Sequence, residues 1–496
     1  MSGTYVWLPE WLREPLVQQS RSTTTWLVGG AIRDRLLGLS TVDYDFAVEE
    51  DACRLARRVA NQVGGHYFTL DVDRDTGRVI LPNVEGGRVV LDFARLRGSD
   101  IEEDLRLRDF TLNALAIDLN IPEKLIDPTG GLQDLKDGVI RTCSPDAIRN
   151  DPIRGLRAVR MALLFEYHIL PETLDLLRAA ANEIPGVSAE RIRDELFRIF
   201  ALDHPGRAVR LMDHLGQIQI LFPELDRLRG LEQPDPHEFT AWDHTLAVMD
   251  HLGGLISVLG RVHVSEEVSQ LAKGEIAYRL GRYREAINDY LDLELSLGRH
   301  IRQIIYLGAL FHDAGKSKTH KVVDDKMRFL GHEQISAKMV ASQAVALQLS
   351  NSETQWLELL VSNYTLPAIL EEEPDLDKRT IYRFIHQTGS AGVGVIILSI
   401  ADLLGRKNPP IDQEALADRV SISRKLLDAY FEAPSDAYDP IPLIRGDELA
   451  EALGIEPGPI IGYLLEGIRE GQVCGEVETR EDAINLAAAL LQGDSD

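Results

Sequence analysis

The hydrophobic residues in the first part of the chain follow a strand-like pattern. Short runs such as Trp26-Leu27-Val28 and Val89 to Phe93 alternate with a helix-like segment from Asp51 to Val63. From about Ala147 onward, apolar residues recur at helical spacing and strand signals almost vanish. The pattern therefore predicts a small mixed sheet with helices, an α+β head, followed by regions that are nearly all helical.

Two segments rich in helix-stopping residues, 231–237 and 433–442, indicate domain edges. The segment Lys273 to Leu291 looks like one helical hairpin of a tetratricopeptide repeat, and because such arrays need about three repeats, we interpret it as an insertion. We predict four parts: a head at 1–146, a helical neck at 147–230, a third domain at 231–432 with a helical insertion near 264–300, and a helical tail at 433–496.

Composition narrows the classes of function. The chain has 496 residues, of which 44% are hydrophobic, enough for several cores. No stretch approaches the roughly 18 consecutive apolar residues of a membrane helix, and the first residues do not resemble a signal peptide. We therefore expect a cytoplasmic protein with no membrane contact. Cys53, Cys143 and Cys474 share no short metal-ligand spacing, which argues against a zinc knuckle or a disulfide framework.

The net charge of −26 should repel a polyanion, so any binding of nucleic acid must depend on local basic clusters. Such clusters contain Arg149, Arg154, Arg157 and Arg160, and then Arg191, Arg193 and Arg198. Taken alone, a solvated helix face is the simpler explanation of each cluster.

The first chemical signal is Gly29-Gly30 with Arg33, followed by Asp43 and Asp45 on a predicted strand. Strand periodicity places the two carboxylates on one face, where they can share magnesium ions. The paired glycines let the backbone approach a triphosphate closely, and Arg33 adds a charge-assisted contact. By itself, an Asp-x-Asp doublet is more often a solvated strand end.

Further motifs follow in order. Asp92 lies on the run Val89 to Phe93 and becomes a third carboxylate of the same site if that strand neighbours the strand with Asp43. The remaining motifs are Asp104 to Ala114 with Arg108, Asp109 and Asn113, then Asp127 to Leu135, Asp151 to Arg160, and Glu190 to Phe197. The ordered set resembles the bacterial branch of the tRNA nucleotidyltransferase and poly(A) polymerase family. The resemblance extends to Leu453–Gly462 in the tail, which is expected to hold the tRNA acceptor arm.

The resemblance implies two magnesium ions held by Asp43 and Asp45, with Asp92 as the third catalytic carboxylate. A 3′-hydroxyl would attack the α-phosphate of a nucleotide, and pyrophosphate would leave. It also implies nucleotide binding, including ribose and phosphate contacts that favour ribonucleotides. The matching residues are Gly29, Gly30, Arg33, Arg108, Asp109, Asn113, Asp151, Arg154, Arg157 and Arg160.

In this family an acid and an arginine after the head act as a protein template for the incoming base. Asp151 and Arg154 match them, and their spacing places both on one face of a predicted helix. The chain departs from the family at Asn150, where Glu is usual, and at Leu107, where a second arginine is usual. Both departures bear on nucleotide choice.

A second set of motifs contains His244, His312, Asp313 and Asp402 and resembles the HD superfamily of metal-dependent phosphohydrolases. Singly, each histidine is more often a core or surface residue than a ligand. The resemblance makes the four residues metal ligands, and mixed imidazole and carboxylate ligands favour a transition metal such as Mn, Ni, Fe or Co. Related enzymes have phosphatase or 2′,3′-cyclic phosphodiesterase activity, or a degenerate site, and the sequence leaves these outcomes open.

The leading function is extension of tRNA 3′ ends with C, or with C and A, from CTP and ATP. Enzymes that complete CCA generally carry a long flexible loop where this chain runs directly from Phe93 to Asp104, so CC addition is favoured. The nearest alternative is a poly(A) polymerase. An alternative of another class is an HD phosphohydrolase with a nucleotide-sensing head. The oligomeric state is left open.

Overall fold

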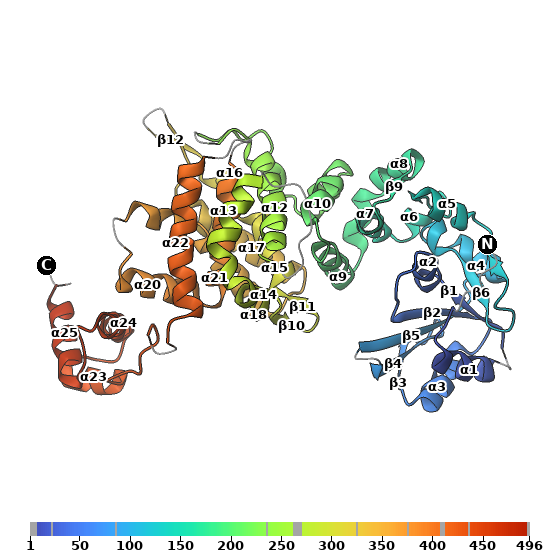
Figure 1. Cartoon of the computed structure of the whole chain (residues 1–496), viewed down its shortest axis with the longest axis horizontal. Coiled ribbons are helices and arrows are strands. Elements are labelled where there is room, and N and C mark those ends of the chain that lie inside the picture. Colours follow the sequence, from blue (N-terminus) through green and yellow to red (C-terminus); the bar gives the residue numbers. More distant parts are fainter. Residues whose placement is uncertain are drawn as a thin grey trace. The chain divides into compact units, whose positions relative to one another are not determined.

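The computed structural model describes residues 7–20, 23–84, 87–234, 237–260, 270–323, 326–373, 376–406, 412–434 and 437–493 (Figure 1). The chain forms two compact units. The first comprises Met1–Ser188 with His214–Ile220, and the second Ala189–Asp213 with Leu221–Asp496. The predicted fold class, an α+β head followed by helical domains, is confirmed. The division into two units runs through the predicted neck, and the four-part division stays a prediction.

A seven-stranded sheet of order β3-β4-β5-β2-β1-β6-β7 forms the core of the head. Its β2 and β5 are parallel, and its other neighbours are antiparallel. The strands are β1 (Thr25–Val28), β2 (Asp43–Val48), β3 (His66–Asp71), β4 (Thr76–Val84), β5 (Gly87–Arg95), β6 (Ala116–Asp118) and β7 (Leu125–Ile126).

One face of this sheet packs in the hydrophobic core of the head. Phe46 of β2 and Phe93 of β5 stack there with ring centroids 4.8 Å apart, in a core that includes α1 (Glu10–Gln19) and α3 (Ala52–Val63). Because side chains alternate along a strand, the residues directly before and after Phe46 and Phe93 point to the opposite face. There, Ile101 of α4 (Ile101–Arg106) packs in a smaller apolar cluster over β1, β2 and β6.

Further helices of the first unit lie between the sheet strands and after them. They are α2 (Gly30–Leu36), the 3₁₀ turn Thr111–Asn113, α5 (Gly131–Asp137), α6 (Ala147–Asn150), α7 (Arg154–Phe165) and α8 (Pro171–Ala179), with a short parallel pair of β8 (Val139–Ile140) and β9 (His168–Ile169). Next come α9 (Ala189–Phe200), α10 (Pro205–His214) and α11 (Gln217–Leu221), where the chain passes between the two units.

The second unit is almost entirely helical, as its apolar spacing predicts. Its longer helices are α12 (Ala241–Val258), α13 (Gln270–Leu280), α14 (Arg284–Leu291), α15 (Ile301–Phe311), α17 (His332–Ala346), α18 (Asn351–Asn363), α20 (Lys378–Thr388), α21 (Gly392–Leu404), α22 (Gln413–Phe431), α23 (Gly446–Leu453), α24 (Pro459–Cys474) and α25 (Arg480–Gly493). Two single turns, α16 (Lys316–Thr319) and α19 (Leu366–Ile369), complete them. Two hairpins, β10 (Glu294–Ser296) with β11 (Arg299–His300) and β12 (Lys321–Val323) with β13 (Lys326–Arg328), are too short to leave a strand pattern in the sequence.

Helices α13 and α14 show that the range near 264–300 is helical, while its interpretation as an insertion stays a prediction; positions 264–269 lie outside the described residues. The segment Lys378–Leu404 is, among the described residues, long and apolar enough to cross a membrane by length and composition alone. Its most apolar window is 72% buried inside the protein. Because α12, α18 and α22 pack against α21, its composition is that of a central core helix.

Candidate functional sites

Three carboxylates lie on the face of the head sheet opposite the aromatic core. In the parallel pair of β2 and β5, Asp45 is the register partner of Asp92, so their side chains project to the same side. Asp43, two residues before Asp45, shares that face. The condition under which Asp92 joins the site is therefore met, and Asp43 and Asp45 are exposed where a ligand can reach them.

The electrostatic surroundings of Asp45 act in opposite directions on its pKa. Desolvation by the surrounding protein, with the charges of Asp92 and Asp43, raises the pKa of the Asp45 carboxyl, while Arg108 acts in the other direction. Asp92 is held by Arg78 of β4 through two hydrogen bonds of 2.8 Å. Hard carboxylate oxygens that share one open face fit magnesium. Among the described residues, the one group of three ligand atoms within 4.8 Å of one another is in the helical unit, so the head carboxylates are more widely spaced.

Gly29 brings the backbone close to this face. Its φ of +77° is one that glycine adopts without strain, and a Cβ there would lie 3.2 Å from Arg108 Nη1 and 3.4 Å from Asp45 Oδ2. The next residue, Gly30, begins α2. The predicted Gly-Gly turn therefore lies beside Asp45, a predicted catalytic carboxylate, and Arg108, a predicted nucleotide-binding residue.

A chain of hydrogen bonds joins four of the predicted nucleotide-binding residues. Arg33 Nη1 donates to Asn113 Oδ1 at 2.5 Å, and Asn113 Nδ2 donates to Asp109 Oδ1 at 3.1 Å. Arg157 Nη1 lies 2.9 Å from Asp109 Oδ2. Burial alone would raise the pKa of Asp109, but the charge and hydrogen bond of Arg157 lower it to about 2. Asp109 is therefore a permanent anion that fixes the two donors around it.

The prediction that Asp151 and Arg154 share one helix face is wrong. Helix α6 ends at Asn150 and α7 begins at Arg154, while Asp151 is extended, with φ −153° and ψ 92°. The reason is Pro152, because a residue before proline is driven out of the helical region. The turn still leaves Arg154 Nε 3.9 Å from Asp151 Oδ2.

Arg154 binds carbonyl groups of the local backbone. It is 8% exposed, and its terminal nitrogens donate to the carbonyls of Ala147, Leu107 and Arg108 at 3.0 to 3.2 Å. Arg108 itself pairs with buried Asp104 at 3.1 Å. Recognition of a base by Asp151 and Arg154 stays a prediction, as do the roles of the other head residues, among them the half-buried Arg160.

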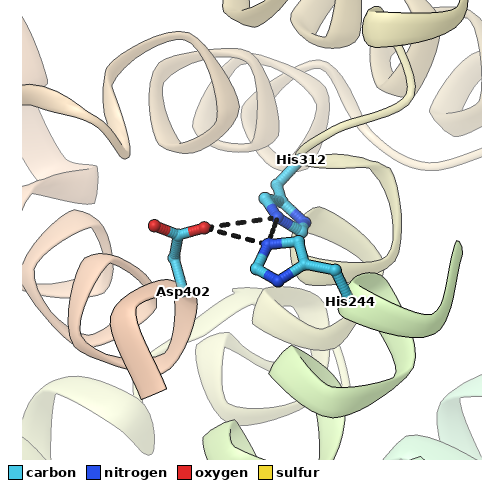
Figure 2. Close-up of side chains that lie close together, drawn as sticks. All are labelled: His244, His312 and Asp402. Carbon is cyan, nitrogen blue, oxygen red and sulfur yellow. Dashed lines mark hydrogen bonds and ion pairs between the residues drawn. The ribbon is translucent and has the colours of Figure 1, made fainter. Parts of the chain in front are cut away.

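The second predicted set of ligands meets in the interior of the helical unit. His244 comes from α12, His312 and Asp313 directly follow α15, and Asp402 comes from α21. Figure 2 shows the two imidazoles and the Asp402 carboxylate pointing toward one another; their ligand atoms all lie within 4.8 Å, the one such group of three found among the described residues. Asp313 Oδ2 lies 3.5 Å from His244 Nε2 and 3.3 Å from His312 Nε2.

Backbone carbonyls orient both imidazoles. His244 Nδ1 lies 3.0 Å from the carbonyl of Gly405, and His312 Nδ1 lies 2.7 Å from that of Ala309. A carbonyl only accepts, so Nδ1 carries a proton in each ring, and Nε2 is the nitrogen that faces the centre and binds a metal once it has lost its own proton. Metal-binding histidines in proteins are oriented in this way, so the residues present fit a divalent transition metal.

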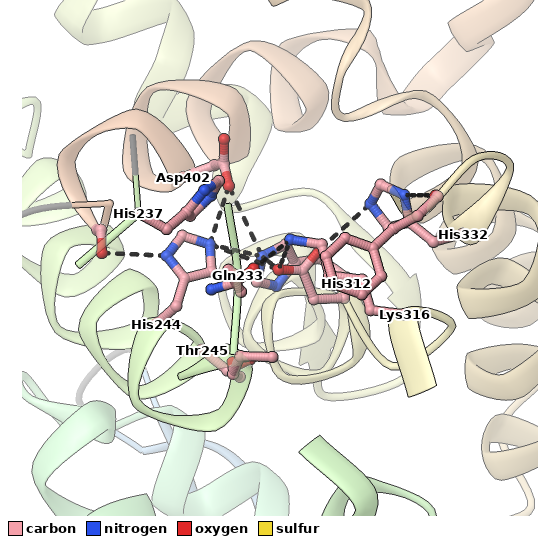
Figure 3. Close-up of polar contacts among 12 residues, drawn as sticks. Gln233, His237, His244, Thr245, His312, Lys316, His332 and Asp402 are labelled. Atoms are coloured by element: carbon pink, nitrogen blue, oxygen red, sulfur yellow. Dashed lines mark hydrogen bonds and ion pairs between the residues drawn. The ribbon is translucent and has the colours of Figure 1, made fainter. Parts of the chain in front are cut away.

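Each of the two buried carboxylates has a cationic partner. Figure 3 shows Lys316 and Asp402 in the same group of polar side chains as the two imidazoles. Lys316 Nζ lies 2.7 Å from Asp313 Oδ2, and the Tyr364 hydroxyl donates to Asp313 Oδ1 at 2.9 Å. Arg406 holds Asp402 Oδ2 at 2.7 Å. Burial opposes ionisation of Asp313, but the charges of His312 and Lys316 keep its pKa well below the usual range.

Sequence reasoning missed Tyr364 and Arg406. The position of Arg406, four residues after Asp402, is a usable signal, because residues at that spacing meet on a helix. Tyr364 is 51 residues from Asp313, and only the fold brings them together.

Three family models match the chain. They are the poly A polymerase head domain over residues 25–141, the probable RNA and SrmB-binding site of polymerase A over 166–228, and the HD domain over 242–407.

Two curated relatives match along nearly the whole chain. The A-adding tRNA nucleotidyltransferase of Deinococcus radiodurans is 30% identical, with 92% of this chain and 93% of the relative covered. The CC-adding tRNA nucleotidyltransferase of Geobacter sulfurreducens is 31% identical, with 92% and 90% covered.

Solved structures share the fold. A CCA-adding enzyme in complex with ATP matches with a TM-score of 0.58 and 22% identity, covering 97% of this chain and 94% of that chain. The Thermotoga maritima CCA-adding enzyme complexed with tRNA matches with a TM-score of 0.53 and 23% identity, covering 97% and 94%.

The buried cluster generates a metal-binding prediction. Asp402→Asn keeps the side-chain shape but removes the anionic ligand, so affinity for Mn²⁺ or Ni²⁺ should fall by more than the roughly 10–100-fold typical of changes outside the ligand shell. Elemental analysis after loading and desalting measures the retained metal. The control is His386→Asn, whose side chain is 53% exposed and outside the cluster. Retained metal in Asp402→Asn, or none in the unmutated protein, would contradict the assignment.

Proposed function

Because the chain belongs to the tRNA nucleotidyltransferase and poly(A) polymerase family, we propose that this enzyme adds C residues to tRNA 3′ ends from CTP. Membership makes it a nucleotidyltransferase, as its ordered motifs predict. The two curated relatives described above are named for different steps, A addition in one and CC addition in the other. The choice between these steps must come from the residues of this chain.

The observation that carries the proposal is the short connection between β5 and α4. Only residues 96–100 separate Arg95 from Ile101. Arg97 N donates to Asp104 Oδ1 at 3.1 Å, and Ser99 N donates to Glu103 Oε2 at 2.7 Å. The connection is thus bonded to the helix that follows it, which supports a single pocket shape and addition of CC without the terminal A.

The head residues have separable roles in this proposal. Asp43 and Asp45 hold magnesium, with Asp92 as the third catalytic carboxylate beside them, and the metal when bound supplies charge neutralisation at the transferring phosphate. Arg33 and Arg157, fixed by Asn113 and Asp109, place cationic donors for the nucleotide. Gly29 lets the nucleotide approach the backbone beside Asp45. Their common task is to align the α-phosphate with the tRNA 3′-hydroxyl.

The extent of extension is directly measurable. With tRNA transcripts that end before CCA, after one C or after CC, and with CTP and ATP together, we expect elongation to stop at CC. Sequencing gels of the products from the purified full chain resolve each added nucleotide. Efficient addition of A to the transcript ending in CC would contradict the proposal and favour A or CCA addition, and long A tails would favour a poly(A) polymerase.

Substitution of Asp45 tests the catalytic carboxylates. Asp45→Asn retains the size but removes a metal-binding charge, so several kcal/mol of transition-state stabilisation should be lost, or about a thousandfold in kcat/KM for CTP. Asp51→Asn, in the same head but after the end of β2, is the matched control and should keep its activity. Normal transfer by Asp45→Asn would remove this residue from the site.

A second candidate function, a metal-dependent phosphohydrolase, is favoured by the convergence of His244, His312 and Asp402 in one buried cluster. We infer that this activity is independent of C addition, because its ligands and the head carboxylates lie in different compact units.

Hydrolysis of 2′,3′-cyclic AMP and p-nitrophenyl phosphate with added Mn²⁺ or Ni²⁺ tests this function. Asp402→Asn should abolish hydrolysis and keep C addition, whereas Asp45→Asn should do the reverse. Loss of both activities in either variant would show that the sites are coupled. Absence of hydrolysis in a metal-loaded unmutated protein would leave the cluster as a structural metal site.

A further inference from the structure

The carboxylates are part of a row of side chains that crosses the sheet. Asp45 of β2 pairs with Asp92 of β5, Asp92 pairs with Arg78 of β4, and Arg78 pairs with Phe68 of β3. Directly paired residues project to the same face. Phe68 therefore shares the face of the reaction site, two strands beyond Asp92.

Phe68 is not needed in the core. Its neighbour Tyr67 packs against the buried core on the other face, with α3, whereas the Phe68 side chain is 49% exposed. The apolar cluster of α4 covers the carboxylate face over β1, β2 and β6, and it includes no residue of β3, β4 or β5. Figure 1 shows β3 and β4 together at one end of the head sheet. This part of the face presents an aromatic ring and a cation to solvent.

The spacing suits a nucleotide next to the reaction site. Adjacent strands are about 4.8 Å apart, so the Cα atoms of Phe68 and Asp92 are separated by about 10 Å. A base attached to a ribose whose 3′-oxygen lies near Asp92 can reach over Arg78 to the ring of Phe68. Single-stranded nucleic acids are commonly bound by such a pairing of an aromatic ring with a neighbouring cation.

We infer that Phe68 and Arg78 form a binding subsite for the 3′-terminal bases of the RNA that is extended. The inference rests on the proposed function, since it supplies the acceptor strand for the same reaction. Phe68 stacks on a terminal base, and Arg78, which already lies beside Asp92, approaches the backbone of the same strand. Stacking accepts any base, as required of a site whose terminal nucleotide changes with each addition.

Local chemistry distinguishes this occupant from a second copy of the chain. The net charge of −26 repels both occupants at long range, so the choice depends on the groups at the surface itself. An aromatic ring with a guanidinium group on the next strand matches a base and the phosphate backbone attached to it. A second copy could still pair with β3, because β3 is an edge strand of the sheet. That occupant is a distinct outcome of the experiment.

The experiment compares Phe68→Leu with Phe68→Trp in the full chain. Leu keeps an apolar side chain but removes the ring, so the KM for a tRNA transcript ending before CCA should rise about tenfold, while Trp should stay near the unmutated value. The KM for CTP should be unchanged in both variants. Ile121→Ala is the control, because Ile121 is 53% exposed and follows β6, outside the row.

A binding readout makes the result independent of catalysis. Transcripts with 4-thiouridine at either of the last two positions should crosslink to the peptide containing Phe68, in the absence of nucleotide. The Kd for the tRNA transcript, measured by filter binding, should also rise about tenfold in Phe68→Leu. If the unmutated chain binds and crosslinks but adds no C, the proposed function fails and the subsite stands.

The subsite is overturned by an unchanged tRNA KM and Kd in Phe68→Leu, or by crosslinks confined to other peptides. It is also overturned if Phe68→Leu abolishes a concentration-dependent dimer of the unmutated protein while RNA binding is kept, since that result assigns the face to a second copy.

Discussion

The parallel pairing of β2 with β5 is the constraint on which the head depends. It places Asp45 opposite Asp92 on one face and Phe46 opposite Phe93 on the other. A slip of one residue would bury the carboxylates and expose the aromatic rings, so the stacking that stabilises the core also fixes the position of the reactive groups. Like charges are thereby held together, and Arg78 and Arg108 limit the electrostatic cost.

The helical unit also brings carboxylates together, and it too offsets their electrostatic cost with cations. Its carboxylates are buried, and isolated buried charges are costly, so Asp313 and Asp402 each have a cation within 2.7 Å. Asp313 also accepts hydrogen bonds, while the two imidazoles are fixed by carbonyls. This centre is preorganised before a ligand arrives. In the head, Asp43 and Asp45 are exposed, which the proposed function requires of a site that exchanges a nucleotide and an RNA end in each cycle.

Local patterns in the sequence predicted what depends on local geometry. The alternation of β2 placed Asp43 and Asp45 on one face, and helical spacing identified the second unit. The prediction that Asp151 and Arg154 share one helix face failed because Pro152 drives the residue before it out of the helical region, so the i, i+3 spacing does not apply. The contact of Tyr364 with Asp313 and the position of Phe68 beside Arg78 arise from helix packing and strand order, which no single segment specifies.

The arginines of the head bear on how an acidic chain binds polyanions in the proposed function. Arg33, Arg78, Arg108 and Arg157 each already pair with a carboxylate of the protein. These partners hold the guanidinium groups in place, so little side-chain entropy is lost when a phosphate arrives, but they also offset much of the attraction. In the proposed function, binding of a nucleotide then depends on charge supplied by magnesium together with exchange of these pairs. Under the same proposal, RNA elsewhere on the chain meets a surface with a net charge of −26, which favours the acceptor end over other polyanions.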